Sequence, residues 1–198
     1  MSLAHANLYD FFDERLADAV DAQGVELSTD SRRYLALLLV ERKRSERLLT
    51  ATDRPDTLAE LHLAAATADR VRAMRLYRHL GDRALYVAGY FQESLKRKAV
   101  GVDYYADMGG AAYQQVATLG GTISVGEDPW AHMFMELAER FRGCIEVLAE
   151  VSERNLADGT QDIVALYERF LESRSEVIAR RLTELGVLTG LAGEDYSH

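Results

Sequence analysis

The stretch from Asp128 to Val151, DPWAHMFMELAERFRGCIEVLAEV, carries the most regular pattern in the chain. Its apolar side chains are Trp130, Phe134, Leu137, Phe141, Cys144, Leu148 and Val151. They recur at alternating steps of four and three residues, which places them on one face of a helix. A stripe with this spacing is typical of helices that pack against antiparallel neighbours in a bundle.

The preceding segment repeats the same pattern through Val102, Tyr105, Gly109, Ala112, Val116 and Leu119. Only two prolines interrupt the whole chain, and long helices tolerate few. The sequence therefore predicts an all-α, single-domain bundle of about six or seven helices over residues 1–198. The helices are expected at 3–22, 31–49, 57–80 (with a bend), 83–98, 102–119, 128–156 and 161–185, followed by a loose C-terminal tail at 186–198.

Local signals set several of these boundaries. Thr57-Leu58-Ala59-Glu60 matches a capping box, in which a threonine and a glutamate satisfy the first backbone N–H groups of a helix. Ser28-Thr29-Asp30 offers capping oxygens before the second helix. Gly81-Asp82 reads as a helix stop followed by a new N-cap, and Asp128-Pro129 as an N-cap followed by proline at the first helical position.

Composition and charge narrow the function classes. The 198 residues are 48% hydrophobic, which suits one folded core. A formal net charge of −9 argues against nucleic acid and anionic membrane surfaces as partners. No apolar run approaches the roughly 20 residues that span a bilayer, and no signal peptide is evident. Cys144, the single cysteine, is expected to be an inert core thiol in a cytoplasmic protein.

Tyrosines and glycines are concentrated between residues 76 and 113. Glycine inside a helix costs about 1 kcal/mol relative to alanine, so Gly89, Gly109 and Gly110 need a reason. They either let two helices approach closely or leave room for a ligand. On the second interpretation, the wall of a small-molecule pocket between the helices at 83–98 and 102–119 consists of Tyr86, Tyr90, Tyr104, Tyr105 and Tyr113.

Two parts of this region, GDRALYVAGYF at 81–91 and DYYADMGGAAY at 103–113, carry a resemblance. They are similar to an arrangement in an uncharacterised family of all-helical bacterial proteins. The likeness covers about a fifth of the chain. It implies a helical fold and brings no activity and no site residue with it.

A metal centre is the alternative interpretation. Helical bundles of the ferritin type hold two irons with carboxylates and histidines placed one helical turn apart. Here Asp128 and His132 have a suitable spacing, and Asp82 lies near His79. The spacing resembles part of the ligand pattern of haem-oxygenase-like di-iron oxidases, although the accompanying glutamate and histidine are not evident. The alternative metal ligands are therefore Asp82, Asp128 and His132.

Glu41 and Arg174 each continue an apolar helical stripe. If both side chains pointed inward they would have to pair, because a buried charge needs a partner. If they pointed outward, each would be solvated. The sequence leaves both arrangements open.

Motifs for nucleotide binding, nucleophilic serine and zinc proteolysis are missing from the sequence, so no catalytic residue and no cofactor can be assigned. The leading hypothesis is a non-enzymatic binding or assembly protein, a homodimer through an apolar helix face, with the tyrosine-lined segment as its small-molecule site. The alternative is an oxidative di-iron enzyme.

Overall fold

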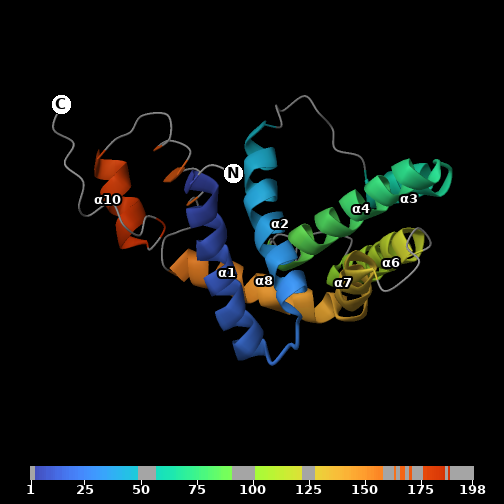
Figure 1. The fold of residues 1–198 in the computed structure, drawn as a ribbon, viewed down its shortest axis with the longest axis horizontal. Coiled ribbons are helices and arrows are strands. Elements are labelled where there is room, and N and C mark those ends of the chain that lie inside the picture. The colour runs from blue at the N-terminus through green and yellow to red at the C-terminus, as the bar shows by residue number, and fades with distance from the viewer. Residues whose placement is uncertain are drawn as a thin grey trace.

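Every element that the computed structural model describes is a helix (Figure 1). The structure describes residues 3–48, 57–90, 101–121, 128–157 and 176–185, and the single positions 163, 166, 167, 170 and 187. Eight helices lie within these residues: α1 (Leu3–Gln23), α2 (Thr29–Leu48), α3 (Leu58–Ala66), α4 (Arg70–Tyr90), α6 (Val102–Gly121), α7 (Pro129–Glu139), α8 (Phe141–Ala157) and α10 (Glu176–Glu184). The all-α class is confirmed, and the expected count of six or seven was slightly low.

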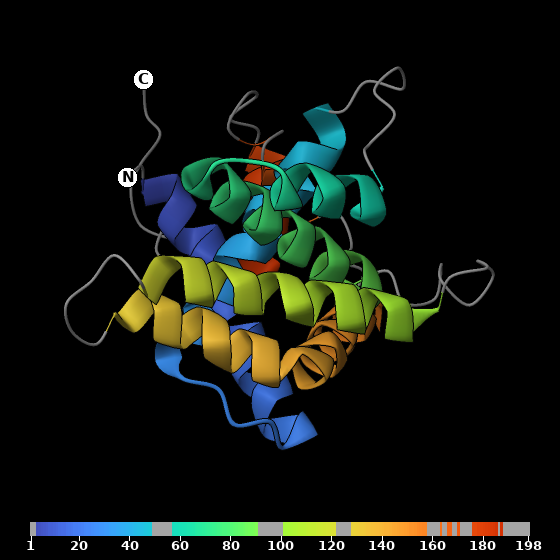
Figure 2. The ribbon, with the colours of Figure 1, turned by 90° about the vertical axis from the view of Figure 1, so that its right-hand side faces the viewer.

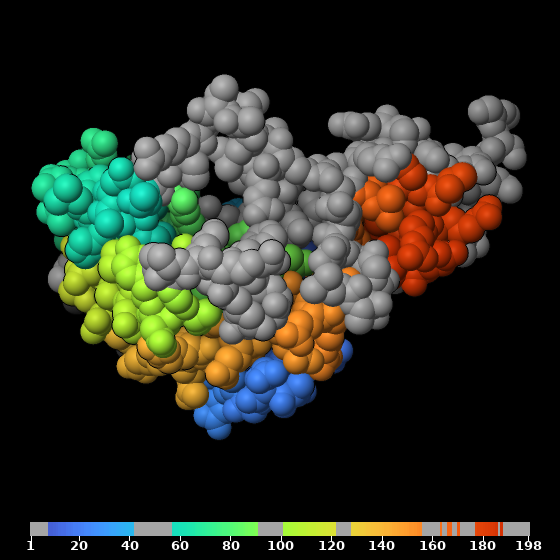
Figure 3. Space-filling view, turned by 180° about the vertical axis from the view of Figure 1, so that it is seen from behind, coloured from blue at the N-terminus to red at the C-terminus, as the bar shows by residue number. Residues whose placement is uncertain are grey.

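The α4, α6 and α7 helices form a stack in which α6 lies between the other two (Figure 2). The α8 helix crosses beneath α4 and contacts α1, which runs beside α2. The α3 and α10 helices lie at opposite ends of the long axis (Figure 3). One continuous cluster of buried apolar side chains joins these elements. No described helix combines the length and apolarity needed to cross a membrane.

Three predicted N-caps are confirmed. The Ser28 hydroxyl accepts a hydrogen bond from the Ser31 backbone N–H at 3.2 Å. The capping box of Thr57 and Glu60 is complete in both directions. Asp128 Oδ1 accepts from the Trp130 backbone N–H at 3.0 Å. Side-chain acceptors therefore mark helix starts reliably in this chain.

Two predicted boundaries were wrong. The chain breaks at 67–69, where Asp69 caps α4, and α4 then runs without interruption through Gly81 and Asp82. Conversely, the segment at 128–156 is not one helix, because Arg140 leaves helical geometry at φ −102° and ψ 21°. This break lets α7 pack on α6 and α2 while α8 packs on α4 and α1. The apolar stripe continues across the break, and all of its members are buried except Trp130.

Glycines set the distance between the stacked helices. A methyl group added at Gly109 would lie 2.7 Å from Phe141 Cε1 and 2.9 Å from Ala84 Cβ. One added at Gly89 would lie 2.6 Å from Leu148 Cβ. These separations are shorter than van der Waals contact, so close helix packing explains both residues. At Gly110 the nearest atom would be 3.5 Å away, an ordinary contact.

Of the proposed pair between Glu41 and Arg174, only one member can be placed. Glu41 is exposed, so it does not point into the core. Arg174 lies outside the described residues, as do 188–198 of the expected tail. The helix face that Glu41 was expected to extend inward therefore turns to solvent at this residue.

The adjacent glycines of α6 test the packing directly. We expect Gly109→Ala to lower the free energy of unfolding by roughly 1–3 kcal/mol, because the methyl group displaces Phe141 and Ala84. Gly110→Ala should raise it by about 0.5–1 kcal/mol through helix propensity alone. Urea denaturation of the two variants measures both changes. Equal effects would show that the α4–α6–α8 contact is looser than described.

Glu136 on α7 anchors the N-terminus of α2. Its carboxylate accepts from the Ser28 backbone N–H at 2.9 Å, from the Ser28 hydroxyl at 2.5 Å and from the Ser31 hydroxyl. Partial burial alone would raise the pKa of Glu136, but these hydrogen bonds outweigh it and lower the pKa below its usual 4.5. The carboxylate also faces the positive end of the α2 dipole, which favours its anionic form.

The lowered pKa makes the contribution of Glu136 dependent on pH. Stability from this carboxylate is present above its ordinary pKa and is lost as the pH falls through the lowered value. We expect Glu136→Gln to cost about 1 kcal/mol at neutral pH and less in acid. Glu139→Gln, at an exposed site on the same helix, is the control for loss of charge. Denaturation of both variants at several pH values checks this, and a pH-independent difference would contradict it.

Candidate functional site

Asp82 is a buried carboxylate in the middle of α4. It is 8% exposed and lies more than two turns from either end of the helix. Its Oδ1 accepts hydrogen bonds from the Tyr34 hydroxyl of α2 at 2.5 Å and from the Tyr113 hydroxyl of α6 at 2.8 Å. The Arg78 Nε lies 3.7 Å from its Oδ2, one helical turn away. Three helices thus meet at one carboxylate, whose charge is compensated by two hydroxyl donors and a guanidinium.

Tyr34 is held from two sides. Its hydroxyl donates to Asp82 and accepts from Arg78 Nε at 3.1 Å, and the Arg78 guanidinium lies over the ring at 5.5 Å. Burial, followed by the nearby negative charge of Asp82, raises the pKa of Tyr34 far above its usual 10.0, although Arg78 opposes this rise. The same two causes raise the pKa of Tyr113, which is fully buried. Both phenols therefore remain protonated, and both hydroxyls donate their hydrogen bonds to Asp82.

Gly81 explains how Tyr113 reaches Asp82. A methyl group at Gly81 would lie 2.5 Å from Tyr113 Cδ1, so the tyrosine ring occupies the space that a side chain would need. The ring also packs edge-on against Phe134 at 5.2 Å and Phe141 at 5.5 Å. The Gly81-Asp82 pair therefore accommodates the Tyr113 ring and binds its hydroxyl. It is not the helix stop and cap that its local sequence indicates.

A pocket of about 450 Å³ opens beside this cluster, between α2 and α7. This volume falls in the range of about 300–1,000 Å³ typical of small-molecule sites. Tyr34 belongs both to the buried cluster and to the wall of the pocket. We name it the α2–α7 pocket. Its lining comprises Asp30, Arg33, Tyr34, Leu37, Asp128, Pro129, Trp130 and Met133.

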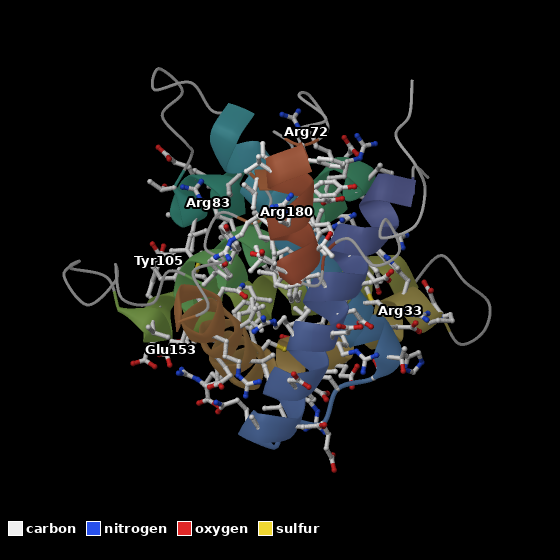
Figure 4. All side chains as sticks on the ribbon, turned by 90° about the vertical axis from the view of Figure 1, so that its left-hand side faces the viewer. Arg33, Arg72, Arg83, Tyr105, Glu153 and Arg180 are labelled. Atoms are coloured by element: carbon white, nitrogen blue, oxygen red, sulfur yellow. The ribbon has the colours of Figure 1, made fainter. Side chains whose placement is uncertain are left out.

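The apolar wall of the α2–α7 pocket contains two large side chains that remain in contact with solvent. Leu37 is 46% exposed and Trp130 is 37% exposed. The other residues of the apolar segment at 34–40 are buried, and Leu37 is its exception. The charged residues of the lining are exposed or half-buried, and we call these three, Asp30, Arg33 and Asp128, the rim of the pocket. Arg33 lies at the periphery of the molecule (Figure 4). An apolar wall with a charged rim is suited to an amphipathic organic ligand.

The five sequence-predicted tyrosines do not share one place. Tyr86 and Tyr90 are buried and stack at 5.5 Å, and the Tyr90 hydroxyl accepts from Asn155 Nδ2 at 3.3 Å. Tyr104 and Tyr105 meet edge-on near the start of α6, where Tyr104 is exposed. Tyr113 belongs to the Asp82 cluster. None of the five lines the α2–α7 pocket.

The structure does not gather the alternative metal ligands either. Asp82 Oδ1 already accepts from two tyrosines, Asp128 caps α7, and His132 is exposed. No group of three or more histidine, cysteine, aspartate or glutamate side chains placed to hold a metal occurs among the described residues. Cys144 is fully buried, and burial raises the pKa of its thiol to about 12, in agreement with the expected core thiol.

Sequence reasoning missed Tyr34 and Arg78. Arg78 and Asp82 are four residues apart, a spacing that places them on one helix face, and this signal was available. Tyr34 had no such signal, because it is separated from Asp82 by 48 positions. A local pattern cannot reveal a contact across that distance.

The Asp82 cluster can be tested with a matched pair of tyrosines on α6. We expect Tyr113→Phe to lower the free energy of unfolding by about 1.5–3 kcal/mol, because it removes a buried hydrogen bond to a charged group. Tyr104→Phe, at a 39% exposed position, should change it by less than about 0.5 kcal/mol. Urea denaturation checks both. If the two variants were equally stable, Tyr113 would contribute only its ring.

Comparison with known proteins gives no further guide to the site. No protein-family model, no curated protein and no solved structure matches the chain. The resemblance at 81–91 and 103–113 therefore stays an expectation. In this molecule the first segment supplies Gly81 and Asp82 to the Asp82 cluster, and the second supplies Tyr113.

Proposed function

We propose that this chain is a non-enzymatic helical protein that binds a small organic molecule in the α2–α7 pocket. The observation that carries the proposal is that two large apolar side chains which remain exposed, Leu37 and Trp130, line the same pocket. Single exposed apolar residues are common, but two large ones in the lining of one open pocket of this volume match the apolar walls of ligand-binding sites.

The rigidity of the wall supports this proposal. Tyr34 is fixed by Asp82 and Arg78, and the ring of Trp130 packs edge-on against Phe134 at 4.6 Å. The main chain at Trp130 is held by the N-cap Asp128. A site whose walls are already ordered loses little conformational entropy when a ligand enters.

The proposal moves the site away from the tyrosines at 86–113. Tyr86, Tyr90 and Tyr113 are buried and have packed or hydrogen-bonded partners, which suits a core more than an open wall. The remaining expectations from the sequence go with the proposal: a cytoplasmic homo-oligomer that binds neither nucleic acid nor membrane.

Binding can be followed without a label, because Trp130 is the single tryptophan of the chain and lines the pocket. We expect phenylbutanol, a small apolar probe with one polar end, to change the Trp130 fluorescence in a saturable manner. Leu37→Gln should weaken its binding about fivefold, because it removes about 1 kcal/mol of apolar contact. Leu63→Gln, at a more exposed leucine (67%) on α3, is the matched control and should have no effect.

Two results would contradict the proposal. One is a fluorescence that does not respond to apolar probes at any concentration below their solubility. The other is an equal effect of Leu37→Gln and Leu63→Gln, which would place binding elsewhere. Circular dichroism of both variants confirms that each remains folded, as expected for substitutions at exposed positions.

A further inference from the structure

We infer that the ligand of the α2–α7 pocket is an organic cation, an amine or quaternary ammonium group attached to an aromatic or aliphatic body. This inference rests on the proposed binding function and adds the charge of the ligand. Three charged residues line the pocket: the carboxylates Asp30 and Asp128 and the guanidinium Arg33. The charge balance of the rim therefore favours a positive group.

The aromatic wall favours the same charge. The face of an indole ring carries negative potential, and tryptophan is the aromatic side chain that attracts cations most strongly. Trp130 offers 37% of its surface to solvent at this site. The Arg78 guanidinium already lies over the Tyr34 ring at 5.5 Å, so one aromatic ring of this wall has a cation beside it. The Trp130 ring is the one that a ligand cation would contact.

The rim carboxylates have oxygens that accept no hydrogen bond from a described residue. Asp128 uses Oδ1 to cap α7, and no hydrogen bond joins its Oδ2 to any described residue. Asp30, in the first turn of α2, forms no side-chain hydrogen bond and no ion pair with another described residue. Arg33 is likewise unpaired within the described part of the chain, so it does not neutralise Asp30 although they are three residues apart.

The charge of the whole chain acts in the same direction. A formal net charge of −9 raises the local concentration of cations around the protein and lowers that of anions. Against this, the N-termini of α2 and α7 both begin at the pocket, and helix N-termini attract anions. An anion bound by Arg33 and these helix ends is the competing outcome, and the experiment must separate the two.

Three probes share one phenyl ring and a chain of four carbons, the last of which is the carboxylate carbon in the third: phenylbutylamine, phenylbutanol and phenylbutyrate. At neutral pH they are a cation, a neutral molecule and an anion. Titrations followed by Trp130 fluorescence should give the tightest binding for the amine, roughly two- to fivefold tighter than for the alcohol, with the butyrate weakest. Added salt should weaken the binding of the amine and leave the binding of the alcohol unchanged.

Opposite charges on the same rim provide the decisive variants. Asp30→Asn should weaken the binding of the amine roughly two- to fivefold and leave the binding of the alcohol unchanged. Arg33→Gln should strengthen the binding of the amine to a similar extent. Glu153→Gln, at an exposed site on α8 away from Arg33 (Figure 4), controls for the change in net charge and should shift neither probe. Asp30, Arg33 and Glu153 are all exposed, so we expect the three variants to keep the fold.

The outcomes distinguish this inference from the function beneath it. If the alcohol and the amine bind equally, or the butyrate binds best, the inference of a cation is wrong while the pocket remains a binding site. If no probe changes the Trp130 fluorescence, the proposed function itself fails, and the inference with it. Opposite effects of Asp30→Asn and Arg33→Gln on the amine alone support both.

Discussion

A buried carboxylate constrains this fold more than any apolar contact does. Apolar side chains tolerate small shifts, because their contact energy depends weakly on direction. The Asp82 carboxylate tolerates less, since its hydrogen bonds from the Tyr34 and Tyr113 hydroxyls depend on distance and direction, and the Arg78 guanidinium must stay near to balance its charge. These partners come from α2, α4 and α6. The rotation of each helix about its own axis is thereby set by one residue.

The α2–α7 pocket follows from that constraint. Leu37 lies one turn along α2 from Tyr34, remains exposed, and lines the pocket together with Trp130 of α7. Glu136 then holds the start of α2 against α7 through Ser28 and Ser31. These polar contacts lie on either side of an apolar wall that remains in contact with solvent.

Local sequence patterns were sufficient to predict most helix positions and several helix starts. Helical periodicity predicted α6 almost to the residue, and capping side chains marked the starts of α2, α3 and α7. It failed where distant partners override local signals. Gly81-Asp82 has the sequence of a helix boundary, but Tyr113 fills the space above the glycine and binds the aspartate. The break at Arg140 has no glycine or proline at the residue itself, and it separates α7, which packs on α6 and α2, from α8, which packs on α4 and α1. The pocket was missed for the same reason: its walls are about a hundred residues apart in the chain.

That separation has a consequence for the order in which the molecule assembles. The α4 and α6 helices are close in sequence, so their contact closes a short loop and can form early. The contact of Ser28 with Glu136 spans 108 positions, and the entropy of closing so long a loop must be met before that contact contributes anything. The two walls of the pocket thus come together only when the chain between α2 and α7 has found its place. A partly folded chain in which α2 and α7 have not yet met therefore lacks this pocket.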